Sequence, residues 1–208
     1  KAARDKVLLG KELKSIVLTP DDLRVTSYHE SGHALMNLLQ PVDTDPLHKL
    51  TIVPRGKALG VTHSLPEREK YTSSKSEMIA NIKVALGGRA AEELIFNKLY
   101  TGAYSDFKKA TSIARAMVCQ YGMSDTLGPV VYSQARNDFM YSQKTAELID
   151  KEVQNLLETM YAQTKQALSD NRDKLEALAE ALLEKETMYA GEVYTLLGID
   201  PRTEHSFS

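Results

Sequence analysis

Two histidines and a glutamate lie close together near the start of the chain, in the run His29-Glu30-Ser31-Gly32-His33. On a helix, residues four apart share one face about a turn from each other, so both imidazoles can point at one metal ion. Zinc lowers the pKa of a bound water to about 7, and Glu30 is placed to accept its proton. We interpret the run as a zinc site with a general base. The alternative is an ordinary amphipathic helix on which two histidines share a face by accident.

A catalytic zinc ion needs a third protein ligand and leaves one position for water. The other histidines, His48, His63 and His205, fall in predicted strand or tail segments, where solvated side chains are expected. No HxxGxxH continuation follows the motif, because residues 34–42 read ALMNLLQPV. A carboxylate is therefore expected as the third ligand. Spacing alone leaves three candidates open, namely Glu92, Glu93 and Asp106.

The motif must be carried by a helix, and the flanking residues predict one. Thr19 suits the N-cap, Pro20 suits the first helical position, and two aspartates favour the positive end of the helix. Helical spacing of apolar and motif residues continues until Pro41, where the helix should end.

The residue pattern changes from helical spacing to short β-rich runs between Leu47 and Leu65. The runs are separated by a Pro-Arg-Gly turn signal and predict two or three strands of a small sheet. A capping box of Ser74 and Glu77 then predicts a helix over residues 75–96. The pair Gly87-Gly88 inside this helix indicates close packing against a neighbouring element.

The rest of the chain is predicted to be mainly helical. We expect a helix from Asp106 to Tyr121, a short strand at residues 130–133, and helix from Asn137 onward. A break at residues 170–171 separates two long helical stretches, and a last short helix should end near Gly198. The predicted fold is mainly α with a small β-sheet, combining a zincin-like motif helix with a C-terminal helical bundle.

Composition excludes several classes of protein. The chain has 208 residues, of which 42% are hydrophobic and 26% charged, with a formal net charge of -2. This balance gives no basic surface for nucleic acid, so no nucleic-acid partner is expected. With the single cysteine Cys119, an internal disulfide is impossible, and a buried inert thiol in a reducing compartment is expected rather than a redox role. Neither a signal peptide nor a stretch of roughly 20 apolar residues is visible, so the chain is expected to be soluble.

Five motifs in order resemble the proteolytic domain of the FtsH-type membrane-anchored AAA metalloproteases. They are HESGHA (29–34), VPRGKALGVT (53–62), LGGRAAEE (86–93), TGAYSDFKKAT (101–111) and YGMSDTLGPV (121–130). The resemblance covers about residues 5–200, and several linked motifs are far more specific than HExxH alone. It implies an ATP-dependent zinc metalloendopeptidase, of which this chain is the peptidase domain.

The resemblance also implies roles for individual residues. The zinc ligands would be His29, His33 and Asp106, with Glu30 as the general base. Glu92 would orient a ligand histidine from behind. The strand over residues 59–65 would pair with extended substrate, through the residues Leu59, Gly60, Val61, Thr62 and His63. Arg89, Arg115 and Tyr104 are left out of the catalytic set, because such side chains more often cover or pair on helix faces.

At the level of the whole protein, the resemblance implies one Zn²⁺ per chain, with ATP used only through an ATPase module outside this sequence. Unfolded or membrane-protein substrates, a homohexamer, and a membrane anchor with this domain on the cytoplasmic or equivalent organellar side are expected. No G-x-x-x-x-G-K-[ST] phosphate loop occurs in the chain. The expected divisions are a linker at 1–18, a peptidase core at 19–136, a helical part at 137–200 and a tail at 201–208.

One alternative function belongs to a different class. The chain could be a catalytically silent, zinc-stabilised oligomerisation module, with the amphipathic helices after residue 140 as its interaction surface.

Overall fold

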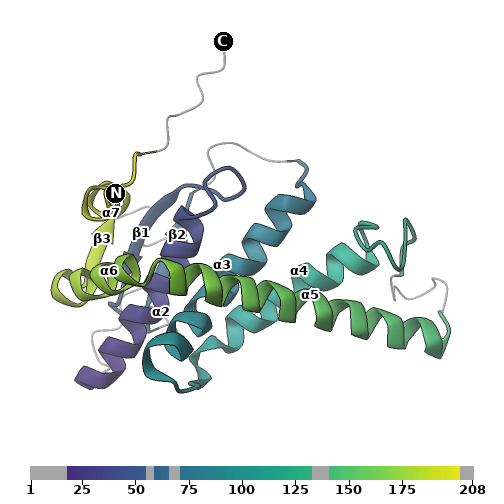
Figure 1. Cartoon of the computed structure of the whole chain (residues 1–208), viewed down its shortest axis with the longest axis horizontal. Helices are drawn as coiled ribbons and strands as arrows, with labels where there is room; N and C mark the ends of the chain where they lie inside the picture. The colour runs from purple at the N-terminus through teal and green to yellow at the C-terminus, as the bar shows by residue number, and fades with distance from the viewer. Residues whose placement is uncertain (1–17, 55–58, 66–70, 133–140, 202–208) are drawn as a thin grey trace, which may run out of the picture.

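A computed structural model describes residues 18–54, 59–65, 71–132 and 141–201. Figure 1 shows a small sheet at the left beside α2, α6 and α7, and the long helix α5 running from there toward the right, where α4 lies. The mainly α prediction with a small β-sheet is confirmed. The elements are α2 (Pro20–Leu38), β1 (Leu47–Thr51), β2 (Val61–Ser64), α3 (Lys75–Phe96), the 3₁₀ turn η1 (Thr101–Ala103), α4 (Tyr104–Cys119), α5 (Gln143–Asp170), α6 (Arg172–Lys185), β3 (Thr187–Tyr189) and α7 (Ala190–Leu197).

Helix α2 begins where its sequence predicts. The Thr19 hydroxyl accepts a hydrogen bond from the backbone N–H of Asp22, and the Asp22 carboxylate accepts one from the backbone N–H of Thr19. This reciprocal capping satisfies two amide groups that the first turn would otherwise leave without partners. The helix ends at Leu38, three residues before Pro41, and all residues from Thr26 to Leu38 except His29 are buried.

In the described residues, the sheet has three antiparallel strands in the order β2-β1-β3. Two of them come from the segment predicted to be β-rich, and the third comes from residues 187–189, far along the chain. The predicted strand at 130–133 is wrong for its described residues 130–132. There the Tyr132 amide donates to the Cys119 carbonyl at the end of α4, so this short apolar run covers a helix end instead of pairing with a strand.

Helices α2 and α3 pack backbone to backbone at a pair of glycines. A Cβ built on Gly32 would lie 2.3 Å from the Gly87 carbonyl oxygen, and one built on Gly87 would lie 2.6 Å from the Gly32 carbonyl oxygen. Neither distance is possible for a real side chain, so both positions require glycine. The close packing predicted from Gly87-Gly88 is thereby explained.

The later helices follow the predicted pattern with shifted ends. Helix α4 begins at Tyr104, two residues before Asp106, and helix α5 begins at Gln143 with Ser142 as its N-cap. The predicted helix start at Asn137 lies outside the described residues. The predicted break falls at Asn171, and α7 ends at Gly198, whose φ of 61° is the left-handed conformation that glycine adopts readily.

Two hydrophobic clusters form the core. One joins α2 and the sheet to α6 and α7, and the other lies between α3, α4 and α5. The C-terminal helices therefore pack directly on the motif helix, where the Ser27 hydroxyl also donates to the Ala179 carbonyl at 2.6 Å. Except for Leu18 and Pro201, the predicted linker at 1–18 and tail at 201–208 lie outside the described residues.

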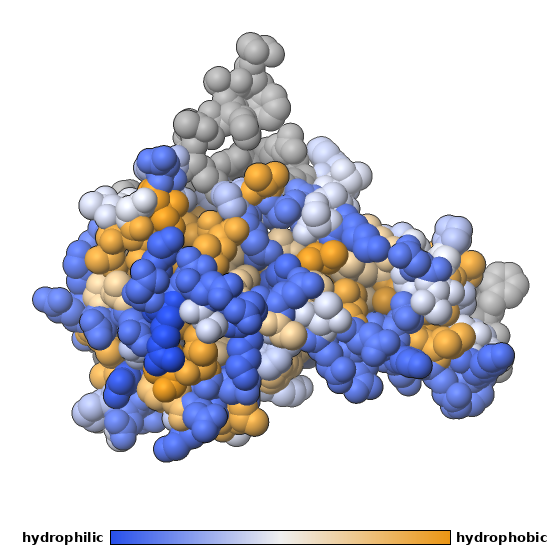
Figure 2. All heavy atoms as spheres, viewed as in Figure 1, coloured by the Kyte–Doolittle hydropathy of each residue, from blue (hydrophilic) through white to orange (hydrophobic). Residues whose placement is uncertain are grey.

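The outer surface agrees with a helical bundle facing water. Figure 2 shows mainly hydrophilic residues along the outward side of α5, the long helix at lower right. Within the described ranges, none of the helices combines the length and apolar character needed to cross a bilayer.

A methyl group placed in the contact between Gly32 and Gly87 should markedly lower the stability of the fold. Gly87→Ala should lower the free energy of unfolding by about 1–3 kcal/mol, as overpacked cores do, although alanine is the better helix former. Urea denaturation with a chelator present would measure this without a contribution from bound metal. Gly191→Ala is the matched control, since its Cβ would meet nothing within 4 Å. Equal stability of both variants and the parent chain would contradict the packing explanation.

Candidate metal centre

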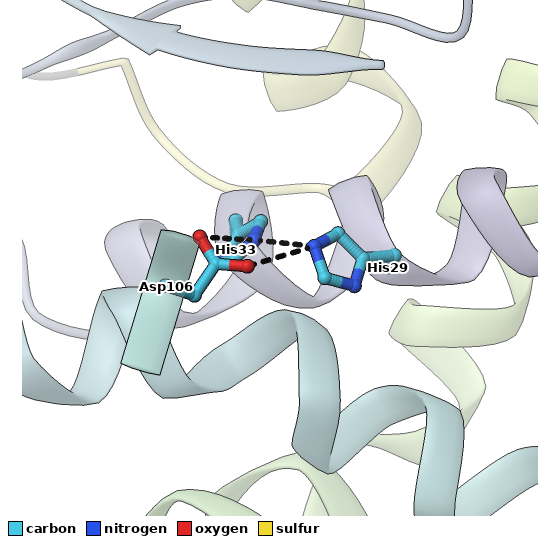
Figure 3. A group of neighbouring side chains, drawn as sticks. All are labelled: His29, His33 and Asp106. Atoms are coloured by element: carbon cyan, nitrogen blue, oxygen red, sulfur yellow. Dashed lines mark hydrogen bonds and ion pairs between the residues drawn. The ribbon is translucent and has the colours of Figure 1, made fainter. Parts of the chain in front are cut away.

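Three side chains from two helices converge on one point. His29 and His33 project from α2, and Asp106 projects toward both rings from the first turn of α4 (Figure 3). The Nε2 atoms of the two rings are 3.0 Å apart. Asp106 Oδ2 lies 3.2 Å from His29 Nε2, and Asp106 Oδ1 lies 3.7 Å from His33 Nε2.

These separations fit a single tetrahedral ion. Zinc binds histidine nitrogen and carboxylate oxygen at about 2.0–2.2 Å, so two ligand atoms of a tetrahedral site are about 3.3 Å apart. The three ligand atoms all lie within 4.8 Å of one another, and their closest separations bracket that value. Two imidazoles and one carboxylate are also a donor set typical of a catalytic zinc with one open position.

The far nitrogen of each ring has its own partner. The Nδ1–H of His33 donates to the Val84 carbonyl at 2.7 Å, which leaves Nε2 as the atom turned toward the centre. The Nδ1–H of His29 donates to Glu92 Oε1, also at 2.7 Å. Such outer contacts fix the tautomer and the orientation of a ligand ring. A Cβ at Gly88 would lie 2.5 Å from the His29 ring, so this glycine admits the ring against α3.

The acidic side chains around His29 favour a positive charge on its ring. Burial opposes a charge on the ring, but hydrogen bonds to Asp106 and Glu92 and the charge of Glu30 outweigh burial and raise the pKa of His29 to about 10. Burial likewise opposes ionisation of Asp106, yet hydrogen bonds from His29 and His33 hold the pKa of this carboxyl well below its usual range. The acids around His29 therefore favour a positive charge at this point, such as that of a protonated ring or a metal ion.

Glu30 lies beside the three converging side chains and is 6% exposed. Its Oε2 atom accepts a hydrogen bond of 2.6 Å from the Thr62 hydroxyl on β2. Its Oε1 atom lies next to Gly60, where a Cβ would come within 2.8 Å of it. The carboxylate is thus held between the helix and the strand that passes over it.

Glu92 is 2% exposed and faces Arg89 as well as His29. The Arg89 Nε atom lies 3.6 Å from Glu92 Oε2, and an Arg89 Nη2–H group donates to the Tyr100 carbonyl just before η1. Arg89 therefore links the acid behind His29 to the turn that leads to Asp106. On sequence grounds Arg89 is left out of the catalytic set as a side chain that covers or pairs on a helix face, and its i,i+3 pair with Glu92 is such a contact. Nothing in the spacing marks its hydrogen bond to the Tyr100 carbonyl.

A cavity of about 690 Å³ opens beside the centre. It is lined by the three converging residues, by Glu30 and Glu92, and by four residues of the predicted substrate strand, Leu59, Gly60, Val61 and Thr62. The fifth, His63, lies in β2 near His48, with ring centroids 5.9 Å apart. The strand order leaves β2 at one edge of the described sheet.

The other candidates are engaged elsewhere. Glu93 accepts hydrogen bonds of 2.6 Å from both Tyr161 and Lys165 on α5, so its carboxylate ties α3 to α5. Cys119 is buried in the core between α3, α4 and α5, and burial raises the pKa of its thiol. A raised thiol pKa disfavours the reactive thiolate. The sequence left three acids as candidates for the third ligand. Of these, Asp106 lies at the point where the two histidines converge, and Glu92 lies behind the His29 ring.

Comparison with known proteins gives the same picture. The family model for peptidase family M41 matches residues 16–196. An ATP-dependent zinc metalloprotease FtsH of Cupriavidus metallidurans is 45% identical over 209 residues, covering 96% of this chain and 32% of the relative. FtsH proteins of Magnetococcus marinus and Rickettsia felis are each 43% identical and cover 96% and 99% of the chain.

The chain spans about a third of the length of these curated relatives. The family match, by contrast, runs through nearly all the described elements, from the motif helix α2 into α7. It includes both histidines, Glu30, Glu92 and Asp106. The chain therefore belongs to peptidase family M41.

Proposed function

We propose that this chain is a zinc-dependent endopeptidase domain that hydrolyses the backbone of unfolded polypeptides. The observation that carries the proposal is the convergence of His29, His33 and Asp106 at the wall of an open cavity, with the Glu30 carboxylate beside them. The relatives are named ATP-dependent zinc metalloproteases, and the donor set in this chain suits the metal in that name.

Zinc would be held by His29 Nε2, His33 Nε2 and one oxygen of Asp106, with Glu92 behind His29. A zinc ion there supplies Lewis acidity toward the scissile carbonyl and lowers the pKa of water to about 7. Glu30 acts as the general base, taking a proton from the attacking water and delivering it to the leaving amine. Its near-complete burial and its hydrogen bond to Thr62 suit a carboxylate that must keep one orientation.

The substrate would lie extended along β2. This strand ends the described sheet on one side, and residues 59–62 line the cavity. A polypeptide added to a strand edge is recognised mainly through backbone hydrogen bonds, so many sequences can be accepted. We therefore include Leu59, Gly60, Val61, Thr62 and His63 as the substrate strand.

The proposal extends to the longer protein implied by the length of the relatives. ATP hydrolysis would unfold and deliver substrates from a module outside this sequence, in a membrane-anchored homohexamer with this domain on the cytoplasmic or equivalent side. The chain itself would bind one zinc ion and no nucleotide.

The alternative of a catalytically silent zinc module is less well supported. Structural zinc sites are closed by four protein ligands, whereas among the described residues three ligand atoms meet here beside a large cavity. A buried carboxylate beside the centre that is not itself among its ligand atoms also has a direct use in hydrolysis.

Loss of the third ligand should release the metal. Asp106→Asn replaces the anionic ligand by a neutral amide, so zinc affinity should fall by more than the roughly 10- to 100-fold typical for loss of a residue behind a ligand. Competition with a chromophoric chelator measures the affinity. Asp125→Asn makes the same change at an exposed aspartate and should bind zinc like the parent. Parent-like affinity of the Asp106 variant would remove this residue from the site.

Glu30→Gln should keep zinc and abolish hydrolysis. The amide has nearly the shape of the carboxylate but cannot accept the proton, and general base catalysis typically contributes about 10²–10⁴-fold. Cleavage of fluorophore-labelled casein, together with zinc content by elemental analysis, measures both properties.

Chelation of the parent chain provides the control for this variant. Casein cleavage should stop when zinc is removed and return when zinc is restored. A silent zinc module would bind the metal but cleave nothing in either condition. Casein cleavage by the Glu30 variant at the parent rate would show that another group is the base.

Glu92→Gln should weaken zinc binding about 10- to 100-fold, because the charge that orients His29 and strengthens its basicity is lost. The neighbouring Glu93→Gln is a matched control on the same helix, since Glu93 contacts Tyr161 and Lys165 instead. Zinc titration of both variants separates the two roles. Equal affinities in the two variants would mean that Glu92 does not support the metal site.

A further inference from the structure

We propose that Thr62 is a positioning residue for the general base, and that its hydroxyl sets the orientation in which the Glu30 carboxylate works. This inference rests on the proposed function and adds a role that lies outside the metal ligands. Thr62 lies on β2 and contacts the motif helix at Glu30, the residue proposed to accept and deliver the proton.

The hydrogen bond from Thr62 is short and is made to the carboxylate of Glu30. Thr62 Oγ1 lies 2.6 Å from Glu30 Oε2 and 3.0 Å from the backbone carbonyl oxygen of the same residue. A hydroxyl has one proton, and an ionised oxygen is the stronger acceptor, so the carboxylate takes the main hydrogen bond. The contact with the backbone carbonyl also places the hydroxyl directly over Glu30.

The other side of the carboxylate is bounded by the same segment of chain. A Cβ at Gly60 would lie 2.8 Å from both Cγ and Oε1 of Glu30, so the carboxylate fills the space that residue 60 leaves empty. Glu30 is therefore confined by Thr62 at one oxygen and by the Gly60 backbone at the other. A long flexible side chain held in this way has its rotamer fixed before substrate arrives.

The position of the hydroxyl is itself set by the sheet. Thr62 pairs with Leu50 of β1 across the antiparallel ladder, and Leu50 is fully buried in the core cluster that contains α2. The register of β2 on β1 thus fixes the height of Thr62 over the motif helix. A strand proposed to bind substrate on its open edge would, by this arrangement, also orient the base.

The test compares Thr62→Val, which keeps the shape and removes the hydroxyl, with Thr62→Ser, which keeps the hydroxyl. For the zinc-loaded chain we expect Thr62→Val to lower kcat for casein cleavage by roughly 10- to 100-fold, as small misplacements of catalytic groups do. The KM and the zinc content should stay close to the parent values, and Thr62→Ser should recover most of kcat. Thr187→Val removes a hydroxyl from β3 of the same sheet, away from Glu30, and should leave kcat unchanged.

Several results would overturn the inference. These are a parent-like kcat in Thr62→Val, an equal loss in the valine and serine variants, or a loss that appears in zinc content or KM alone. If Thr62→Val is not folded in circular dichroism, Thr62→Ala is measured in its place against the same serine variant. Failure of the parent chain to cleave casein with zinc bound would instead count against the proposed function, so the two failures are distinguishable.

Discussion

The site depends on the backbone contact between α2 and α3. Because Gly32 and Gly87 carry no side chains, the two helices approach until the carbonyl oxygen of each glycine occupies the place of a Cβ on the other. Only at that separation can His33 Nδ1 reach the Val84 carbonyl and His29 Nδ1 reach Glu92. A wider spacing, such as the usual 8–10 Å between helix axes with larger residues at the contact, would separate both rings from the partners that orient them. The two glycines therefore determine how the His29 and His33 rings are oriented.

The second constraint is electrostatic. Glu30, Glu92 and Asp106 gather around two imidazoles in a partly buried space, and such a group of acids is costly without compensating positive charge. Although burial opposes it, these acids favour a positive charge on His29 and raise the pKa of its ring. A divalent cation would supply more positive charge than one proton does. Arg89 adds a fixed positive charge behind Glu92, so the outer acid can stay buried whether or not metal is bound.

Much of the fold was predictable because local signals were strong. The capping boxes at Thr19 and Ser74 fix the starts of α2 and α3, and helical spacing marks both histidines as neighbours. The third strand was not predictable, because Thr187–Tyr189 is three residues long and becomes a strand only through its pairing with β1. The run at 130–132 was misread for the opposite reason, since none of the strands in the described residues pairs with it. Spacing alone also could not choose Asp106 over Glu93, because the choice depends on how α3 and α4 pack.

The topology of the sheet explains why a short C-terminal strand bears on a site near the N-terminus. Without β3, the central strand β1 would have an open edge on the side away from the metal centre. With β3 paired there, β1 is the central strand, and the two edge strands of the described sheet are β3 and, on the cavity side, β2. Helix α6, which leads into β3, also packs on α2, so the same segment supports the motif helix and supplies the strand that covers the far side of β1. Under the proposed function, an extended polypeptide adding to β2 lies on the cavity side of the sheet, next to Glu30 and the ligand residues. Helix α6 and β3 contribute by packing on α2 and β1, the two elements against which β2 and Glu30 are held.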